Sequence, residues 1–467
     1  MQLIANMTVV ALPRISGTLD FSADTIMWIN LIYLMSFVAF SVPFAKIISQ
    51  YGIKRCTRLS LILLFVSVLL SFLSVNVYML LLSRLLQGIT SASLAISIYV
   101  MIVEEFTEHE LGTALGIVAS AGYVGMLIAP SFMGSIIHIA NWRFAFLVLI
   151  PIIFILLYLL HNIEKEWHTE KKPIDNIGSI IYIFAMILFT YGITELDQNG
   201  LIFLIMSLIL LAVFIKIEKR VKEPILNMNL FKNVRYAIGN YAAMTTYFTT
   251  TIAITALSFH LKYVLDIEEY IIGIILIIAP IIMIGMTNIG GALSNKYDAR
   301  LISGIAMLFL FVSMLMFFFM DDLPFELILL ACALQGIGNG LFSAPNNKYV
   351  LTIVDEKDLA DASSVLSSSK EFGKILSSGI YALILSAFIG EQALGPEHLD
   401  SQLIQSTDVM MFICALVTLS AAILLFYSKF KYEPGQNPEV IKILKSIEPT
   451  FVKKRREKYN KKTEKEF

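Results

Sequence analysis

Long apolar runs separated by short charged segments recur along the whole chain, and they constrain its fold more than any other feature. A helix needs about 20 mostly apolar residues to cross the hydrocarbon core of a bilayer, which is about 30 Å thick. Only 15% of the residues are charged and 57% are apolar, whereas soluble domains carry about 25% charged residues. The runs therefore predict an all-α integral membrane protein. The predicted spans are residues 25–48, 58–76, 78–102, 112–137, 142–161, 176–194, 200–216, 236–262, 270–294, 301–320, 324–350, 361–390 and 408–428.

Residues 1–15 have the composition of the end of one further helix. The stretch up to Pro13 covers only roughly 20 Å at about 1.5 Å per residue, which is too short to span a bilayer. We therefore expect that helix 1 is truncated and that the natural chain begins upstream. With this helix the predicted count is fourteen.

Lysine and arginine are enriched on the cytoplasmic side of membrane proteins, so their distribution tests the topology. If the N-terminus is cytoplasmic and the chain crosses alternately, cytoplasmic loops and the tail hold 29 of the 35 basic residues. Both termini are therefore expected in the cytoplasm, with residues 429–467 as a basic cytoplasmic tail. The exceptions lie outside (Arg14, Arg143, Lys262) or within helices (Arg84, Lys370, Lys374).

Arg84 stands inside the apolar run LLSRLLQGIT, residues 81–90. A charge at the bilayer centre costs about 2.5–3.5 kcal/mol on insertion scales, so its surroundings must compensate. Arg84, Gln87 and Gly88 share one helix face, which must point toward other helices or a wet cavity. The spacing resembles motif B of the major facilitator superfamily, which implies a role for Arg84 in proton transfer. The alternative is that Arg84 only holds two helices together.

The next predicted helix carries small residues and a proline in GIVASAGYVGMLIAPSFMGS. Small residues let helices approach closely, and proline removes a backbone hydrogen bond and bends the helix. The spacing resembles the antiporter signature of the same superfamily, motif C, G-x8-G-x3-G-P-x2-G-G, with Ala129 and Met133 replacing two glycines. Ordinary small-residue packing is the alternative. The matching positions are Gly116, Gly125, Pro130 and Gly134.

The segment AKIISQYGIKR, between the second and third predicted helices, resembles motif A of that superfamily. Ala45, Ser49 and Gln50 replace its first glycine, its aspartate and its arginine, which argues against a charge-relay function of this loop. A second copy, GALSNKYDAR, and the echo of LQGITSASLAIS in LQGIGNGLFSAP indicate two repeated halves. The matching positions are Gly52, Lys54 and Arg55 in the first copy, and Gly291, Asn295, Lys296 and Arg300 in the second.

Two further stretches, NWRFAFLVLIP and EKRVKEPILNMNLFKN, resemble the fourteen-span drug:proton antiporter branch of the superfamily. The resemblance runs from Leu3 to about Tyr427. It implies the major facilitator fold, with two six-helix halves, residues 1–161 and 236–428, and two inserted helices in residues 175–217. The inserted helices are expected to lie outside the core of the two halves.

Exporters of this branch usually carry an aspartate in helix 1, where this chain has Ile4. A proton-coupled exporter needs a group that binds and releases a proton. Glu371 is the carboxylate that we place inside a predicted span, so it is our candidate proton carrier. The alternative is that Glu371 stays charged because Lys374 stands at i+3.

Polar and aromatic residues inside the spans are our candidates for lining a central cavity. Tyrosine rings and amides suit amphipathic molecules, although membrane helices also use such groups for hydrogen bonds to one another. The candidates are Asn30, Tyr33, Tyr123, Tyr247, Thr251, Gln335 and Asn339.

These features predict a monomeric, secondary active transporter of the plasma membrane that exports small amphipathic or toxic compounds in exchange for protons. Its partners would be a small-molecule substrate, protons and lipid, with no nucleic acid. The sequence contains no G-x-x-x-x-G-K-[ST] loop, no zinc spacing among its three cysteines, and no enzyme-like arrangement within the helices. We therefore expect no cofactor, no metal and no enzymatic activity. A metabolite exporter, an uncoupled facilitator, and a transport-inactive sensor or scaffold remain alternatives.

Overall fold

The structure is a computed structural model that describes residues 1–8, 15, 23–139, 141–164, 167, 174–195, 198–389 and 400–427. The described part consists of helices and their connections, without any strand. This confirms the predicted all-α fold. The predicted tail, residues 429–467, lies outside the described residues.

Twelve helices of the described part are long and apolar enough to cross a membrane. The predicted span at 236–262 corresponds to α10 (Val234–Phe259), which is not among the twelve. Its six threonines lower its mean hydropathy, although it packs inside the bundle against α14 and α15. The N-terminal segment is helical over residues 2–8, where its described part ends.

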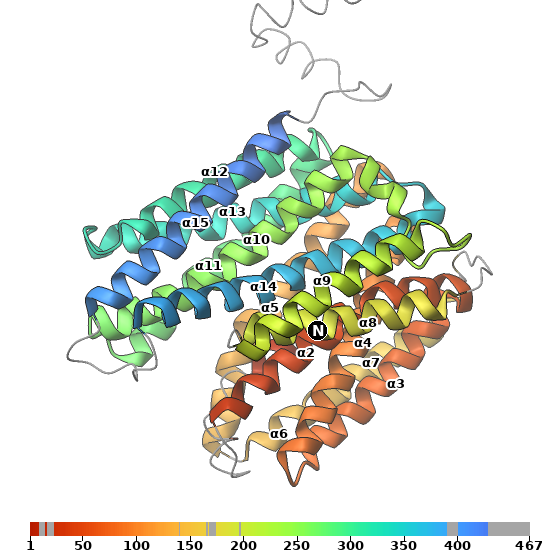
Figure 1. Ribbon diagram of the computed structural model, residues 1–467, viewed down its shortest axis with the longest axis horizontal. Helices are drawn as coiled ribbons and strands as arrows, with labels where there is room; N and C mark the ends of the chain where they lie inside the picture. Colours follow the sequence, from red (N-terminus) through yellow and green to blue (C-terminus); the bar gives the residue numbers. More distant parts are fainter. Residues whose placement is uncertain are drawn as a thin grey trace, which may run out of the picture.

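The N-terminal half contains α2 to α7, drawn in red to yellow in Figure 1. The predicted span 142–161 is divided into two helices at Val148. Pro151 explains the break, because it has no N–H to donate to the carbonyl of Leu147. The helices are α2 (Ala23–Tyr51), α3 (Ile53–Phe72), α4 (Val77–Glu105), α5 (Glu108–Ile139), α6 (Trp142–Leu147) and α7 (Leu149–Asn162).

The C-terminal half begins after a 3₁₀ turn, η1 (Met228–Lys232), and contains α10 to α15. α10 continues into a π-helical turn, η2 (His260–Val264), and α14 follows a 3₁₀ turn, η3 (Glu356–Asp358). The other helices are α11 (Glu269–Ser294), α12 (Ala299–Phe318), α13 (Phe325–Leu351), α14 (Leu359–Ile389) and α15 (Asp400–Tyr427).

Short polar side chains begin several of these helices by accepting hydrogen bonds from the free N–H groups of the first turn. Asn76 accepts from Met79 at the start of α4, at 2.9 Å. Asp175 accepts from Ile177 and Gly178, both at 3.0 Å, at the start of α8 (Asn176–Thr194). These caps fix where the chain turns back into the bilayer.

The two inserted helices, α8 and α9 (Gln198–Glu218), lie side by side along the seam where α2 and α14 meet (Figure 1). Trp28 of α2 stacks on Tyr191 at 5.4 Å and donates to Glu195 at 3.2 Å. Phe189 packs on Phe372 of α14, with ring centroids 4.8 Å apart. α8 therefore contacts both halves from outside, and α9 packs mainly on α8.

The surface of the bundle is apolar and its interior is partly polar. On α3, Leu59, Ile62, Leu63 and Val66 are exposed along one face, whereas several serines of the same helix are buried. A soluble protein rarely exposes such a continuous apolar face. The outer faces are therefore suited to lipid, and polar groups find partners between helices.

The two halves meet along two seams, α2 and α4 against α14, and α5 against α11 and α13. Gly112 of α5 and Gly291 of α11 cross so closely that a Cβ on either would overlap the carbonyl oxygen of the other. This crossing requires glycine at both positions. The second copy of motif A, which contains Gly291, therefore lies in the seam between the halves.

Candidate functional site

Arg84 is fully buried in the N-terminal half, where neutral acceptors surround its guanidinium. Its Nε donates to the carbonyl of Ile29 in α2 at 3.0 Å. Its Nη1 donates to the carbonyl of Ile4 at 3.2 Å and to the Gln87 side chain at 2.8 Å. Gln87 in turn donates to Ser71 of α3 at 2.9 Å. Arg84 and Gln87 thus link the N-terminal segment, α2, α3 and α4.

Tyr33 of α2 lies against Arg84 and interacts electrostatically with Glu371 of α14. The guanidinium carbon lies 4.7 Å from the centre of the Tyr33 ring, which is a favourable cation–π distance. α4 can pass this close to α2 because Gly88 faces the Tyr33 carbonyl and Ser36, leaving no room for a Cβ. The three motif B positions therefore lie together at the contact between α2 and α4.

Lys370 of α14 is only 6% exposed and lies between the halves. Its ammonium donates to the Tyr99 hydroxyl of α4 and to the Asn347 side chain of α13, both at 2.8 Å. It also lies 5.0 Å from the Tyr99 ring centre and 5.8 Å from that of Tyr247. All these partners are neutral, and they come from α4, α10 and α13.

Glu371 pairs with Lys374 of the same helix, whose ammonium is 3.0 and 2.9 Å from the two carboxylate oxygens. The Lys374 ammonium lies 5.3 Å from the centre of the Tyr247 ring. Tyr247 is therefore flanked by two lysines. Tyr123 of α5 reaches the same region from the other half, where it interacts with Ser343 of α13.

The remaining cavity candidates are spread more widely. Asn339 accepts from Thr250 of α10 at 2.7 Å and donates to the carbonyl of Gln335 at 3.0 Å, so it joins α13 to α10 within one half. Thr251 donates to the carbonyl of Tyr247 in its own helix at 2.8 Å. Asn30 is half-buried on α2. The structure thus brings Tyr33, Tyr123 and Tyr247 near the charged residues and uses Asn339 in helix packing.

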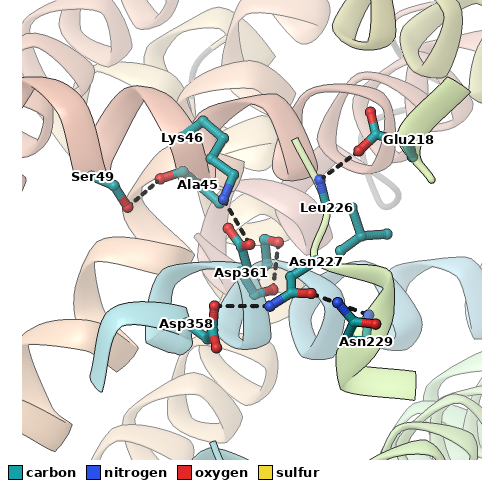
Figure 2. Close-up of polar contacts among 10 residues, drawn as sticks. Ala45, Lys46, Ser49, Glu218, Leu226, Asn227, Asn229, Asp358 and Asp361 are labelled. Carbon is teal, nitrogen blue, oxygen red and sulfur yellow. Dashed lines mark hydrogen bonds and ion pairs between the residues drawn. The ribbon is translucent and has the colours of Figure 1, made fainter. Parts of the chain in front are cut away.

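One end of the bundle, where α2, α4, α11 and α13 end and α5, α12 and α14 begin, joins the halves; we call it the closed end. Figure 2 shows its α2–α14 side. Lys46 of α2 donates to Asp361 of α14 at 2.8 Å, and Asp361 is only 2% exposed. Next to it, Asn227 donates to Asp358 at 3.1 Å. The segment that precedes α10 is thereby fastened to the start of α14.

The α5–α11 side of the closed end is held by Asn295 and Lys348. Asn295 accepts from the Gly112 N–H and donates to Thr113, both at 2.8 Å. Lys348 donates to the Glu108 carbonyl at 2.6 Å and to the Asn295 side chain at 3.1 Å. Apart from the central contacts of Lys370 and Tyr123, the hydrogen bonds described here between the halves, together with Ser41–Ser368 and Ser120–Asn288, lie toward the closed end.

The matched positions of the two motif A copies differ in their contacts, although Lys46, at an unspecified position of the first copy, reaches Asp361 of the other half. In the first, Gly52 has a φ of 90°, Lys54 donates to the Ile163 carbonyl of its own half, and Arg55 is exposed. In the second, Gly291 and Asn295 contact α5 across the seam. Lys296 is exposed, and Arg300 pairs with Asp298 at 3.3 Å.

The motif C glycines face two different neighbours. A Cβ at Gly116 would lie 3.0 Å from the Thr287 carbonyl of α11, and one at Gly125 would lie 3.2 Å from the backbone N of Leu3. α5 thus packs closely on the other half with one glycine and on the N-terminal segment with another. Pro130 and Gly134 lie on α5, but their surroundings fall outside the described residues.

The closed end also carries a cavity of about 570 Å³. Charged side chains of both signs line it, including Glu104 of α4, Arg235 of α10, and Asp298 and Arg300 at the start of α12. None of the tyrosines near Lys370 lines this cavity. It is therefore a separate polar vestibule at the closed end.

The opposite end carries carboxylates of its own. His260 lies 3.1 Å from Asp321, and burial together with the neighbouring Asp322 carboxylate raises the pKa of Asp321. Asp408 lies inside α15, because this helix begins at Asp400 and not at the predicted residue 408. Glu371 is therefore not the only carboxylate within a helix of the described part.

Several site residues were not identified from the sequence. Tyr99, Asn347 and Lys370 form one cluster, but they are 248 and 23 residues apart along the chain. The charge of Lys370 within a span and the polar run PNNK inside another were the available signals. Lys46 and Asp361 stand near helix ends, where charged residues are ordinary, so the sequence offers no such signal for them.

The sequence profile of the Major Facilitator Superfamily matches residues 1–224 and 239–459. The riboflavin transporter RibZ of Clostridioides difficile (strain 630) is 22% identical over 90% of this chain and 93% of its own length. The multidrug resistance protein Stp of Mycobacterium tuberculosis is 22% identical over 81% of this chain and 72% of its own. The human organic anion transporter MFSD10 has a similar structure, with a TM-score of 0.64, 12% identity, and coverage of 91% and 96%. This likeness shows the fold alone.

Proposed function

Because this chain belongs to the Major Facilitator Superfamily, we propose that it exports small amphipathic compounds by alternating access, driven by protons. The observation that carries the proposal is the distribution of contacts between the halves. Most of these contacts lie at the closed end. Buried tyrosines and charged side chains from both halves lie next to this end, in the centre of the molecule. A transporter that exposes a central site to one side at a time has this arrangement.

We assign the closed end to the cytoplasm, which makes this conformation outward-facing. The basic segments KRCTR after α2 and KRVK after α9 lie at this end, and basic loops favour the cytoplasmic side. The same assignment gives cytoplasmic termini. In this orientation the Lys46–Asp361 and Lys348–Glu108 contacts close the path to the cytoplasm.

The substrate site in this proposal is the region between Tyr33, Tyr99, Tyr123 and Tyr247. Aromatic faces bind planar amphipathic molecules without demanding one hydrogen-bond pattern. Stp is named a multidrug resistance protein, which supports a broad substrate range. The match to a riboflavin transporter over 90% of this chain favours a planar-ring metabolite as the second candidate substrate.

Two buried carboxylates are our candidates for binding the driving proton, since helix 1 lacks the usual aspartate. Glu371 lies beside the tyrosines, and its protonation would release Lys374. Asp361 joins the halves through Lys46, so its protonation would remove an ion pair that holds the closed end shut. Protonation of Asp361 would therefore couple proton binding to opening of the closed end, whereas protonation of Glu371 would couple it to substrate binding.

The proposal is tested by flux from proteoliposomes that contain the purified protein and are loaded with ethidium or riboflavin. We expect release of at least one compound to exceed that from protein-free liposomes and to accelerate when a pH gradient is imposed. Protein-dependent flux at the same rate with and without the pH gradient would identify a facilitator. Flux equal to that of protein-free liposomes for both compounds would favour a transport-inactive sensor or scaffold.

A further inference from the structure

The charges inside the spans around the tyrosines are unbalanced. In the described part, Arg84, Lys370 and Lys374 bring three positive charges, and Glu371 brings one negative charge. The other carboxylate well inside a helix, Asp408, interacts with Asp321 and Asp322 at the opposite end. The centre of the molecule therefore carries excess positive charge.

Lys370 is the cation that lies between the two halves, beside the tyrosines, without an acidic partner in the hydrogen bonds described for it. Glu371 is already paired with Lys374, and Arg84 lies inside the N-terminal half, where its Nε and Nη1 donate to Ile29, Ile4 and Gln87 and its Nη2 has no hydrogen-bond partner among the described residues. The neighbours of Lys370 within hydrogen-bond distance are the neutral Tyr99 and Asn347 side chains. An ammonium has three donors, and these two acceptors use two of them.

A buried charge without an opposite charge is costly unless a ligand or partner compensates it. The groups around the third donor of Lys370 are the rings of Tyr99 and Tyr247. A carboxylate, sulfonate or phosphate oxygen at this donor would form a charge-assisted hydrogen bond. An aromatic ring attached to it would lie against tyrosine faces.

We propose that the substrate of this site is an aromatic organic anion, whose acidic group binds Lys370 and whose ring packs on Tyr99 and Tyr247. This inference rests on the proposed function, because it assigns a substrate class to the transport site. It opposes the usual expectation of cationic drugs, since a cation would meet two lysines while the single carboxylate is already neutralised by Lys374.

The test uses two xanthene dyes of opposite charge, carboxyfluorescein as the anion and rhodamine 123 as the cation. Binding to the purified protein is measured by fluorescence anisotropy, and flux is measured separately in proteoliposomes. We expect carboxyfluorescein to bind about tenfold tighter or more, and Lys370→Gln to remove about tenfold or more of its affinity. Lys370→Arg should stay within about threefold of wild type, because it keeps the charge and the donors.

Matched variants separate the charge from general damage. Lys370→Glu should reverse the preference toward rhodamine 123. Lys357→Gln removes an exposed lysine of the closed end, with a side chain 56% exposed, and should leave both affinities unchanged. Size-exclusion chromatography of each variant shows that the fold persists.

The outcomes distinguish this inference from the proposed function. Lys370-dependent binding of carboxyfluorescein without flux supports the anion site and contradicts transport. Flux of either dye with tighter binding of rhodamine 123 supports transport and overturns the anion site. Binding of neither dye, or carboxyfluorescein binding that Lys370→Gln leaves intact, also overturns it.

Discussion

Lys46 and Asp361, which are 315 residues apart in the sequence, form an ion pair of 2.8 Å that joins the two halves of the protein at the closed end. Asp361 is almost completely buried, whereas Lys46 keeps some contact with solvent. Removing one partner of such a pair leaves the other charge uncompensated. The pair therefore stabilises the closed end only while both charges are present.

We predict that Asp361→Asn shifts the molecule toward a conformation in which the two halves separate at the closed end. Loss of the pair should raise the ratio of molecules separated at this end to molecules closed there by about tenfold or more, as expected for a charged hydrogen bond of about 1.5–3 kcal/mol. The shift is measured in a variant that carries a cysteine in place of Ser368 and lacks Cys56, Cys332 and Cys414. Labelling of that cysteine with N-ethylmaleimide should become faster by the same factor.

The control for this experiment is Lys357→Gln, which breaks the exposed pair with Asp355 at the same end. Exposed pairs contribute only about 0–1 kcal/mol, so labelling at Ser368 should hardly change. Equal labelling rates in Asp361→Asn and wild type would show that the Lys46–Asp361 pair does not hold the closed end.

Arg84 provides a second prediction. Lysine keeps the positive charge but cannot donate in the planar fork that reaches both Ile29 and Ile4. Arg84→Lys should therefore remain folded and lose about tenfold or more of the transport rate. Arg84→Ala should abolish transport and lower the Tm, because buried acceptors lose their donor at about 1–3 kcal/mol each. Normal proton-driven flux in both purified variants would leave Arg84 as a structural link between helices at most.

The crossing of Gly112 and Gly291 gives a third prediction. In Gly291→Ala the new methyl group would collide with the Gly112 backbone, so the closed end should open and cysteine labelling at Ser368 should increase. Gly285→Ala is the matched control on the same helix, because a Cβ there meets nothing within 4 Å. If both variants label at the wild-type rate, the glycine crossing is not needed for closure.

Glu371 gives a fourth prediction. Glutamine imitates the protonated carboxyl group, so Glu371→Gln should transport at a rate that no longer responds to a pH gradient. Glu326→Gln, at the exposed start of α13, should respond like wild type. If transport by Glu371→Gln still responds to the pH gradient, Glu371 is not the proton-binding group and Asp361 becomes the candidate.

The sequence predicted the helices well because each must satisfy its own backbone in lipid and present an apolar surface. It was less accurate at polar helix ends. α15 begins at Asp400 and not at 408, because polar first turns extend beyond the hydrocarbon and escape an apolar window. Polar contacts between distant residues were not predicted. Lys370–Tyr99 spans 271 residues and Lys46–Asp361 spans 315, and no local pattern encodes such pairings.

Motif A illustrates the same limit. The loss of its aspartate at Ser49 argued against a charge relay in this loop, and Lys54, at a matched position, donates to the Ile163 carbonyl of its own half. The structure adds that Lys46, one turn before Ser49, forms the contact with the other half. The motif comparison did not single it out, because Lys46 stands at a position of the segment where the motif specifies no residue, and its partner Asp361 lies outside the motif.

The most direct test of alternating access measures distances at both ends of the bundle in one preparation. Spin labels are introduced in the cysteine-free background at exposed residues, Arg58 and Lys296 at the closed end, and Tyr78 and Asp322 at the opposite end. When pH is lowered with carboxyfluorescein present, we predict that the 58–296 distance lengthens while the 78–322 distance shortens. Distances that stay constant at both ends, or that change in the same direction, would contradict alternating access in this protein.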